Sequence, residues 1–349
     1  MATLAPLPPA RPAPRTNEAA APVLEVQDLS AFYQLSHFGI EREVRAVDGI
    51  SFAIGRNEIY GLAGESSSGK SSLIKTVAGA IRPPLNVVGG SVTFDFGGKK
   101  TSLYAKPRPD MSALRWKHLS YIMQGSMSVL NPVRRIRASF VDFAHRHIGG
   151  TTADFLQTVR AHLDRLHLPD SVLESYPHEL SGGMRQRVTI ALATVCQPEF
   201  VIADEPTTAL DVVVQKSVLG MIREVQREMG SSMLFVTHDM SVHANLTDRL
   251  GVMYAGRLVE EGRTRDLFRR PMHPYTKHLI GSLPRIGATA PKKGLEGSPP
   301  NLANPPKGCR FHPRCPVARP VCSEVVPPLE VLAPGQRVAC HVAKEEAGR

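Results

Sequence analysis

The sequence predicts an α/β fold in which helices cover a largely parallel β-sheet, and two observations lead to this prediction. The segment 57–63 is typical of a strand that runs into a glycine- and serine-rich loop, after which apolar residues recur at helical spacing. Further along, two short apolar runs, 200–203 and 233–236, are separated by a helical segment over 214–229. Buried strands that alternate with helices are typical of a parallel sheet, whose strands need crossover connections.

The remaining elements are expected in the following order. A strand opens the ordered chain at 23–26, and the helix after the glycine-rich loop ends near Pro83 and Pro84. Residues 105–180 are predicted to be mainly helical, and a strand pair is expected over 251–260. One face of the helical part carries Phe155, Val159, Leu163 and Leu166, and the strand pair turns at Ala255 and Gly256.

Changes in composition along the sequence divide the chain into three parts. Residues 1–22 are rich in Ala and Pro and are predicted to be a disordered tail, because they lack the continuous apolar segment of a signal peptide. Residues 23–270 are expected to form the main domain, with 105–180 as its helical subdomain. Residues 271–349 form a small C-terminal extension, in which a proline-rich linker over 284–308 leads to four cysteines.

Charge and hydropathy set limits on the partners. The formal net charge is +10 and 42% of the 349 residues are hydrophobic, but no apolar run has the roughly 18 residues that a membrane-spanning helix needs. A basic surface suits either a nucleic-acid or an anionic membrane partner, or simply a solvated face. Because no cluster of Lys and Arg is interleaved with aromatics, no nucleic-acid partner is expected.

Residues 64–71 read Gly-Glu-Ser-Ser-Ser-Gly-Lys-Ser, a phosphate-binding loop between a strand and a helix. Backbone N–H groups and the positive end of the helix are expected to bind the phosphates of ATP there. Lys70 is predicted to reach the β- and γ-phosphates, and the hydroxyl of Ser71 to bind Mg²⁺. The predicted nucleotide contacts in this loop are Gly64, Glu65, Ser66, Ser67, Ser68, Gly69, Lys70, Ser71 and Ser72.

Two carboxylates and two further polar side chains complete the predicted catalytic set. Asp204 and Glu205 end the strand 200–203, so Asp204 is expected to hold Mg²⁺ and Glu205 to act as general base toward the attacking water. His238 follows the next strand and is predicted to contact the γ-phosphate. Gln124 follows the apolar run 121–123 and is predicted to reach Mg²⁺ and the water, whereas Tyr33 is expected to stack on adenine.

Together with the sequence Leu-Ser-Gly-Gly-Met-Arg-Gln at 180–186, these motifs resemble the ATP-binding-cassette (ABC) superfamily in content and order. The resemblance covers 23–270 and implies a phosphate-loop core sheet with an antiparallel β subdomain and a helical subdomain. In that superfamily the signature residues serve the nucleotide of a second subunit. The resemblance adds Ser181, Gly182, Gly183, Gln186 and, in the loop 209–211, Asp211 to the predicted nucleotide contacts.

The chain departs from the usual pattern of the superfamily at two positions. Ser67 stands where its importers usually have glycine, which puts the tight geometry of the loop in question. Gly125 follows Gln124 where an acidic residue is common, which bears on contact with a membrane partner.

Cys196 lies in an apolar helical stretch and is predicted to be a core residue, whereas the other four cysteines gather within the last 41 residues of the chain. Cys309, Cys315, Cys322 and Cys340 lack the close pairs that are usual in structural zinc sites, and four loosely spaced thiolates suit an iron–sulfur cluster. From spacing alone, zinc with His312 or His341 as a substitute ligand, and free thiols, also remain open.

Residues 273–283 and 308–316 resemble the C-terminal extension of oligopeptide/dipeptide importer ATPases. That resemblance implies a [4Fe–4S] cluster on the four cysteines, ATP and Mg²⁺ as cofactors, and an ATPase that drives uptake of peptides. The implied partners are a second, related ATPase subunit, two membrane permeases and an extracytoplasmic solute-binding protein. The chain is then expected on the cytoplasmic face of the plasma membrane. Oligosaccharides, opines or nickel are alternative solutes, and a DNA-associated ABC ATPase is the rival from another class.

Overall fold

The computed structural model describes the chain over six ranges, and all structural statements below concern these residues. The described ranges are 21–37, 40–125, 129–148, 150–208, 210–283 and 295–348. Residues 1–20 of the predicted disordered tail, Ala209 of the loop 209–211 and residues 284–294 of the predicted linker therefore lie outside the described residues.

The main sheet has eight strands in the order β11-β12-β10-β9-β3-β8-β7-β6. Its centre, from β9 to β6, is parallel throughout, as predicted, and the other pairs are antiparallel. The strands are β3 (Ile59–Ala63), β6 (Leu119–Ile122), β7 (Phe200–Asp204), β8 (Ser232–Val236), β9 (Arg249–Tyr254), β10 (Arg257–Arg263), β11 (Glu330–Ala333) and β12 (Gln336–Val338). The predicted strand pair with its turn at Ala255 and Gly256 is confirmed as β9 and β10.

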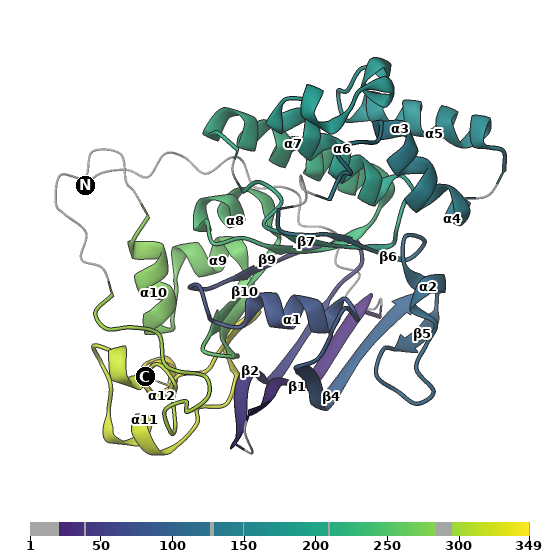
Figure 1. The fold of residues 1–349 in the computed structure, drawn as a ribbon. Coiled ribbons are helices and arrows are strands. Elements are labelled where there is room, and N and C mark those ends of the chain that lie inside the picture. The colour runs from purple at the N-terminus through teal and green to yellow at the C-terminus, as the bar shows by residue number, and fades with distance from the viewer. Residues whose placement is uncertain are drawn as a thin grey trace.

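A second, antiparallel sheet has the order β2-β1-β4-β5. It contains β1 (Leu24–His37), β2 (Ile40–Ile54), β4 (Leu85–Phe96) and β5 (Lys99–Ser102). Helix α1 (Lys70–Val77) lies between the two sheets (Figure 1). Its side chains Leu73, Ile74 and Val77 are fully buried in one apolar cluster with residues of both sheets. The helix that follows the phosphate loop is thereby fixed from two sides.

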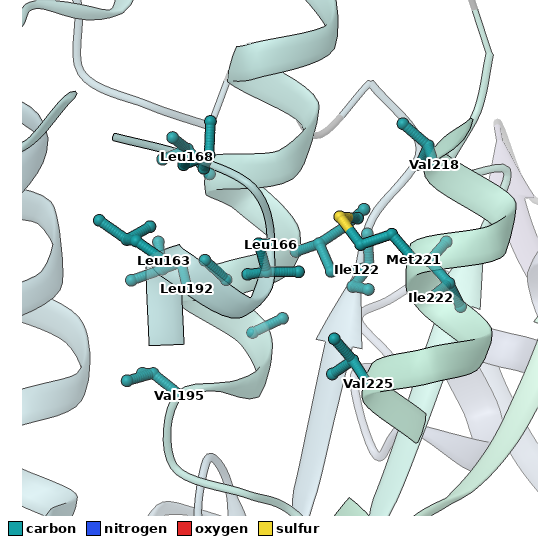
Figure 2. Packing of buried hydrophobic residues seen from close by; sticks show 14 of the residues in the cluster. Ile122, Leu163, Leu166, Leu168, Leu192, Val195, Val218, Met221, Ile222 and Val225 are labelled. Atoms are coloured by element: carbon teal, nitrogen blue, oxygen red, sulfur yellow. The ribbon is translucent and has the colours of Figure 1, made fainter. Parts of the chain in front are cut away.

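Helices cover the other face of the main sheet. They are α3 (Ile136–Phe140), a π-helical turn (Val141–His145), α4 (Arg146–Ile148), α5 (Thr152–Arg165), α6 (Gly182–Thr194) and α7 (Val212–Met229). The predicted apolar face of α5 is buried, and Figure 2 shows Leu163 facing Leu192 of α6, with Ile122 of β6 and Met221 of α7 nearby. The predicted mainly helical range 105–180 also includes α2 (Met111–Leu114) and strand β6, which joins the edge of the main sheet.

The C-terminal part of the chain begins with α8 (Met240–Leu246), α9 (Thr264–Arg269) and α10 (Pro274–Gly281). Residues 295–348, here called the C-terminal segment, contain α11 (Pro320–Glu324), β11, β12 and α12 (His341–Ala347) and lie at the end of the molecule away from α3 and α5 (Figure 1). Strand β12 pairs with β10, and Arg337 forms an ion pair with Glu261, which is 1% exposed. Because a buried carboxylate needs a partner, this pair attaches the segment to the main sheet.

Candidate active site

The phosphate loop connects β3 to α1 and is packed tightly against neighbouring backbone. Gly64 has φ +150° and Gly69 has φ +101°, both in the region that favours glycine. A Cβ atom at Gly64 would lie 2.2 Å from the carbonyl oxygen of Met253, and one at Gly69 would lie 2.0 Å from that of Ala46. The two glycines of the motif are therefore required by close approach as well as by conformation.

Lys70 points into the loop that precedes it. Its Nζ donates hydrogen bonds to the carbonyl oxygens of Gly64 (2.7 Å) and Glu65 (2.8 Å). Burial lowers the pKa of Lys70, although the nearby carboxylates of Glu205 and Asp204 act in the opposite direction. A buried ammonium inside a ring of backbone groups is suited to bind an anion such as a phosphate.

The departure at Ser67 has a structural consequence. Ser67 keeps the loop spacing but has φ +65°, a left-handed conformation that costs a non-glycine residue of order 1 kcal/mol. The side chains of Ser66, Ser67 and Ser71 are exposed, so they are open to a ligand, whereas Ser68 is buried. The loop therefore keeps its geometry with serine, at the expense of local strain.

Tyr33 lies in β1 beside the start of α1. Its hydroxyl is 3.1 Å from Oγ of Ser72, a member of the phosphate motif, and its ring packs partly buried against the cluster between the sheets. This places the predicted adenine contact next to the loop. Stacking on adenine itself stays a prediction.

The two predicted carboxylates stand at the end of β7 in different environments. Asp204 is 5% exposed and accepts a hydrogen bond from the hydroxyl of Tyr121 (3.1 Å). Burial raises the pKa of Asp204, so the fold without a cation disfavours its ionised form. A buried carboxylate with one hydroxyl partner fits a Mg²⁺ ligand, because Mg²⁺ is usually held by one or two carboxylates together with phosphates and water.

Glu205 is the residue on which the predicted catalytic side chains converge. Its carboxylate accepts hydrogen bonds from Nε2 of Gln124 (3.1 Å) and from the Thr208 hydroxyl (2.9 Å), and it lies 3.1 Å from Nδ1 of His238. Burial would raise the pKa of Glu205, but the hydrogen bonds from His238 and Thr208 outweigh it, so the pKa lies below its usual range. The structure thus brings Gln124, Glu205 and His238 together as predicted and keeps the base ionised.

The departure at Gly125, where an acidic residue is common in the superfamily, is explained by the backbone conformation. It has φ +66°, which a larger residue adopts only with strain. Glycine after Gln124 therefore suits the turn by which the chain leaves β6.

The signature residues form a separate site at the start of α6. Oγ of Ser181 caps this helix by accepting a hydrogen bond from the backbone N–H of Met184 (3.2 Å). Ser181 is exposed, Gly182 has open space at its Cβ position, and a Cβ atom at Gly183 would lie 2.8 Å from Val214 of α7. Gln186 is buried within α6. Asp211 caps α7 through the N–H groups of Val213 and Val214, a role that sequence analysis did not predict.

The four clustered cysteines lie near one another. The pKa of Cys309 is raised to about 11, chiefly by burial and in part by the neighbouring thiols of Cys340, Cys322 and Cys315. The backbone N–H of Cys309 bonds to the carbonyl oxygen of Cys322 (2.8 Å), and these cysteines are not joined by disulfides. Over the described ranges, no group of three or more His, Cys, Asp and Glu side chains is arranged as a metal site. Thiols are the donor type that iron–sulfur clusters use, but in the described residues they are not arranged as a ligand set. Cys196 is half-buried against the helical core, close to the core position predicted for it.

Several residues that support the site carry no clear signal in the sequence. Tyr121 and Thr208 bond to the two carboxylates, whereas Tyr275 and Arg314 contact the phosphate loop from positions more than 200 residues away in the chain. Tyr121 could have been noticed as the polar end of the strand before Gln124. No local signal points from Tyr275 or Arg314 to the loop.

The phosphate loop after β3 and the carboxylate pair at the end of β7, which β8 separates from β3 in the sheet, define a nucleotide-hydrolysing site of the P-loop class. Two solved structures share the fold. A dimeric ATP-binding cassette bound to ADP and phosphate is 21% identical, with a TM-score of 0.58 over 69% of this chain and 99% of that one. CbiO1 from Clostridium perfringens is 24% identical, with a TM-score of 0.59 over 72% and 92%.

Sequence comparison narrows the class. Residues 47–208 match the ABC transporter family, and 259–322 match the C-terminal region of oligopeptide/dipeptide transporters. The oligopeptide transport ATP-binding protein OppD of Salmonella typhimurium is 40% identical over 328 residues, which cover 93% of this chain and 95% of that protein. The dipeptide transport ATP-binding protein DppD of Caldanaerobacter subterraneus is 37% identical over 326 residues, covering 93% and 98%. The chain belongs to the oligopeptide/dipeptide group of ABC transporter ATP-binding proteins and is an ATPase.

No helix within the described ranges is long and apolar enough to span a membrane.

Proposed function

We propose that this chain powers the import of peptides by hydrolysing ATP at a site shared with a second cassette. The observation that carries this proposal is the arrangement around Glu205, whose ionised carboxylate is held by Gln124 and His238 beside the buried Lys70. An ionised carboxylate is suited to take the proton of an attacking water. Lys70 and the loop N–H groups would bind the phosphates, Ser71 and Asp204 would hold Mg²⁺, and Gln124 and His238 would orient the water.

The second cassette is proposed from the exposed signature. Ser181 and Gly182 face open space, and α7 begins with Val212 and Val213, which are 80% and 79% exposed. Apolar side chains that are this exposed beside a nucleotide motif suit a protein contact. In this proposal Ser181, Gly182 and Gly183 bind the γ-phosphate of ATP on the partner cassette, while Gln186 and Asp211 support that surface. ATP then favours the closed pair because it binds both cassettes.

The membrane partners are proposed to dock beside Gln124. Met123, Val129 and Val133, which lie close to Gln124 in the sequence, are 51%, 47% and 79% exposed. We expect these apolar side chains to contact a permease, and Gln124, which bonds to the general base, to couple that contact to hydrolysis. Two permeases and an extracytoplasmic solute-binding protein complete the proposed importer, with this chain on the cytoplasmic face of the plasma membrane and a related ATPase as its partner.

Reconstituted vesicles test the transport proposal. The chain, its partner cassette, the permeases and the binding protein should take up labelled di- and oligopeptides when MgATP is supplied on the cassette side. A matched complex with Glu205→Gln should not. Uptake of an oligosaccharide, an opine or nickel in preference to peptides would assign the same machine to another solute.

A [4Fe–4S] cluster on Cys309, Cys315, Cys322 and Cys340 is proposed as a further, structural cofactor. Its support is the gathering of four thiols and the backbone N–H groups that bond to the sulfurs of Cys322 and Cys340 (both 3.5 Å), a contact that tunes such clusters. Protein purified without oxygen should contain about four irons per chain, and Cys315→Ser should lose them while Cys196→Ser keeps them. Stoichiometric zinc in place of iron would refute the cluster.

A further inference from the structure

The C-terminal segment reaches into the nucleotide site through one arginine. Arg314, whose side chain is 7% exposed, forms a two-point ion pair with Glu65 of the phosphate loop, with Nη1–Oε2 at 2.8 Å and Nη2–Oε1 at 3.3 Å. The guanidinium also donates to the hydroxyl of Tyr254 (3.2 Å) and the carbonyl oxygen of Glu296 (3.0 Å). Four contacts in a buried setting fix the arginine firmly.

Further residues outside the motif support the phosphate loop, some of them through the turn at Ala255 and Gly256. Arg310 donates to the carbonyl oxygen of Ala255 and forms an ion pair with Asp48, and the adjacent Gly256 N–H bonds to the carbonyl oxygen of Ser68 (2.8 Å). The backbone N–H of Glu65 is bonded to the hydroxyl of Tyr275 in α10 (2.8 Å). The phosphate loop is therefore supported from outside its own motif on both sides.

The charge of Glu65 indicates that Arg314 does more than fix the loop in place. A carboxylate inside a loop that binds a triphosphate repels the ligand, because like charges at close range disfavour each other in a partly buried site. Glu65 is the only acidic residue in 64–72, and Arg314 is its ion-pair partner among the described residues. Without Arg314, the carboxylate would keep its charge and would also be free to turn toward the phosphates.

We propose that Arg314 is a positioning residue for ATP: it neutralises Glu65 and holds its carboxylate away from the phosphates. The C-terminal segment therefore contributes directly to ATP binding. This inference goes beyond the proposed transport function and does not depend on the solute, the second cassette or the cluster. It requires only that a single chain binds ATP.

Nucleotide binding by the full chain tests the proposal through a double-mutant cycle. The affinity of purified protein for trinitrophenyl-ATP, and its displacement by MgATP, is measured for the parent, Arg314→Gln, Glu65→Gln and the double variant. Arg314→Gln should weaken MgATP binding about tenfold, equivalent to about 1.4 kcal/mol. The double variant should bind within about threefold of Glu65→Gln alone, because removing the carboxylate removes the need for the arginine.

Controls separate this role from simple destabilisation. Arg319→Gln removes another arginine of the same segment, whose exposed ion pair is with Glu345, and should leave MgATP affinity unchanged. Arg314→Lys keeps the charge but loses the two-point geometry, so it should bind MgATP more weakly than the parent and more tightly than Arg314→Gln. If Arg314→Gln yields little folded protein, the loss of MgATP affinity in Arg314→Lys and its recovery on adding Glu65→Gln serve as the test. In the assembled transporter, Arg314→Gln should raise the KM for ATP and leave kcat nearly unchanged.

Three results would overturn the proposal. One is an unchanged affinity in Arg314→Gln. The second is a double variant that binds as weakly as Arg314→Gln, which would assign the arginine a purely structural role. The third is a loss of affinity in Arg314→Lys as large as that in Arg314→Gln, which would remove charge neutralisation as the cause.

Discussion

The phosphate loop and the signature differ in how completely a single chain assembles them. Lys70, Asp204 and Glu205 are buried or bonded to side chains from several strands, and the loop is held by residues from β1 to the C-terminal segment. Ser181 and Gly182, in contrast, bond only within their own helix or face open space. One chain therefore completes its phosphate site and leaves its signature surface open, as we expect if the nucleotide is shared with a second cassette.

The largest expected effects separate these two regions. Lys70→Ala should remove ATP binding by the single chain as well as hydrolysis, because it deletes the cation at the centre of the loop.

Ser181→Arg should leave ATP binding by the single chain unchanged and lower hydrolysis by the assembled transporter about 100-fold, because it blocks a contact made only in the closed pair. Nucleotide titration of the chain and ATPase assays of the complex measure the two effects.

Loss of the cap at α6 must be distinguished from loss of the signature contact. Ser181→Ala removes the cap and should destabilise the chain by about 1 kcal/mol, which a thermal melt records. If Ser181→Arg abolished nucleotide binding by the single chain as Lys70→Ala does, the contrast between the two regions would be wrong.

A smaller effect should appear at Asp204. Because burial raises its pKa, the folded protein without Mg²⁺ holds the proton more tightly than the unfolded chain, and the resulting stability is lost as pH rises through the folded pKa. Above the folded pKa, the cost of burying the charged carboxylate is fully present. At a pH above that value, Asp204→Asn should raise the melting temperature of nucleotide-free protein by about 2 °C while removing hydrolysis.

The pH dependence provides the check on this explanation. Below the pKa of an unfolded aspartate the parent is protonated in both states, so the gain from Asp204→Asn should vanish there. A gain that persists unchanged in acid would show that it comes from packing and not from the buried charge.

The smallest effect is expected at Ser67. Ser67→Gly removes the strain of a positive φ, partly offset by the entropy that glycine loses on folding, so we expect at most about 1 kcal/mol of stabilisation. Ser66→Gly, at a neighbouring residue without a positive φ, should instead be neutral or destabilising. Chemical denaturation measures both variants, and a stability loss in Ser67→Gly equal to that of Ser66→Gly would contradict the strain.

The sequence predicted the parts of the fold and site that have local signals. The strand, loop and helix around Lys70, the parallel centre of the sheet and the convergence of Gln124, Glu205 and His238 all follow from motifs at strand ends. The pairing of β12 with β10 and the contact of Arg314 with Glu65 could not be predicted. Both join residues that are far apart in the chain, and a three-residue strand carries too little periodicity to reveal its partner.

The most direct test of the central claim is a structure of the assembled transporter with Glu205→Gln and MgATP. This variant should bind ATP without hydrolysing it. We expect two closed cassettes in which one triphosphate touches both Lys70 of this chain and the signature serine of the partner cassette. Cassettes that stay apart under saturating MgATP, with the signature surface of Ser181 open to solvent, would contradict it.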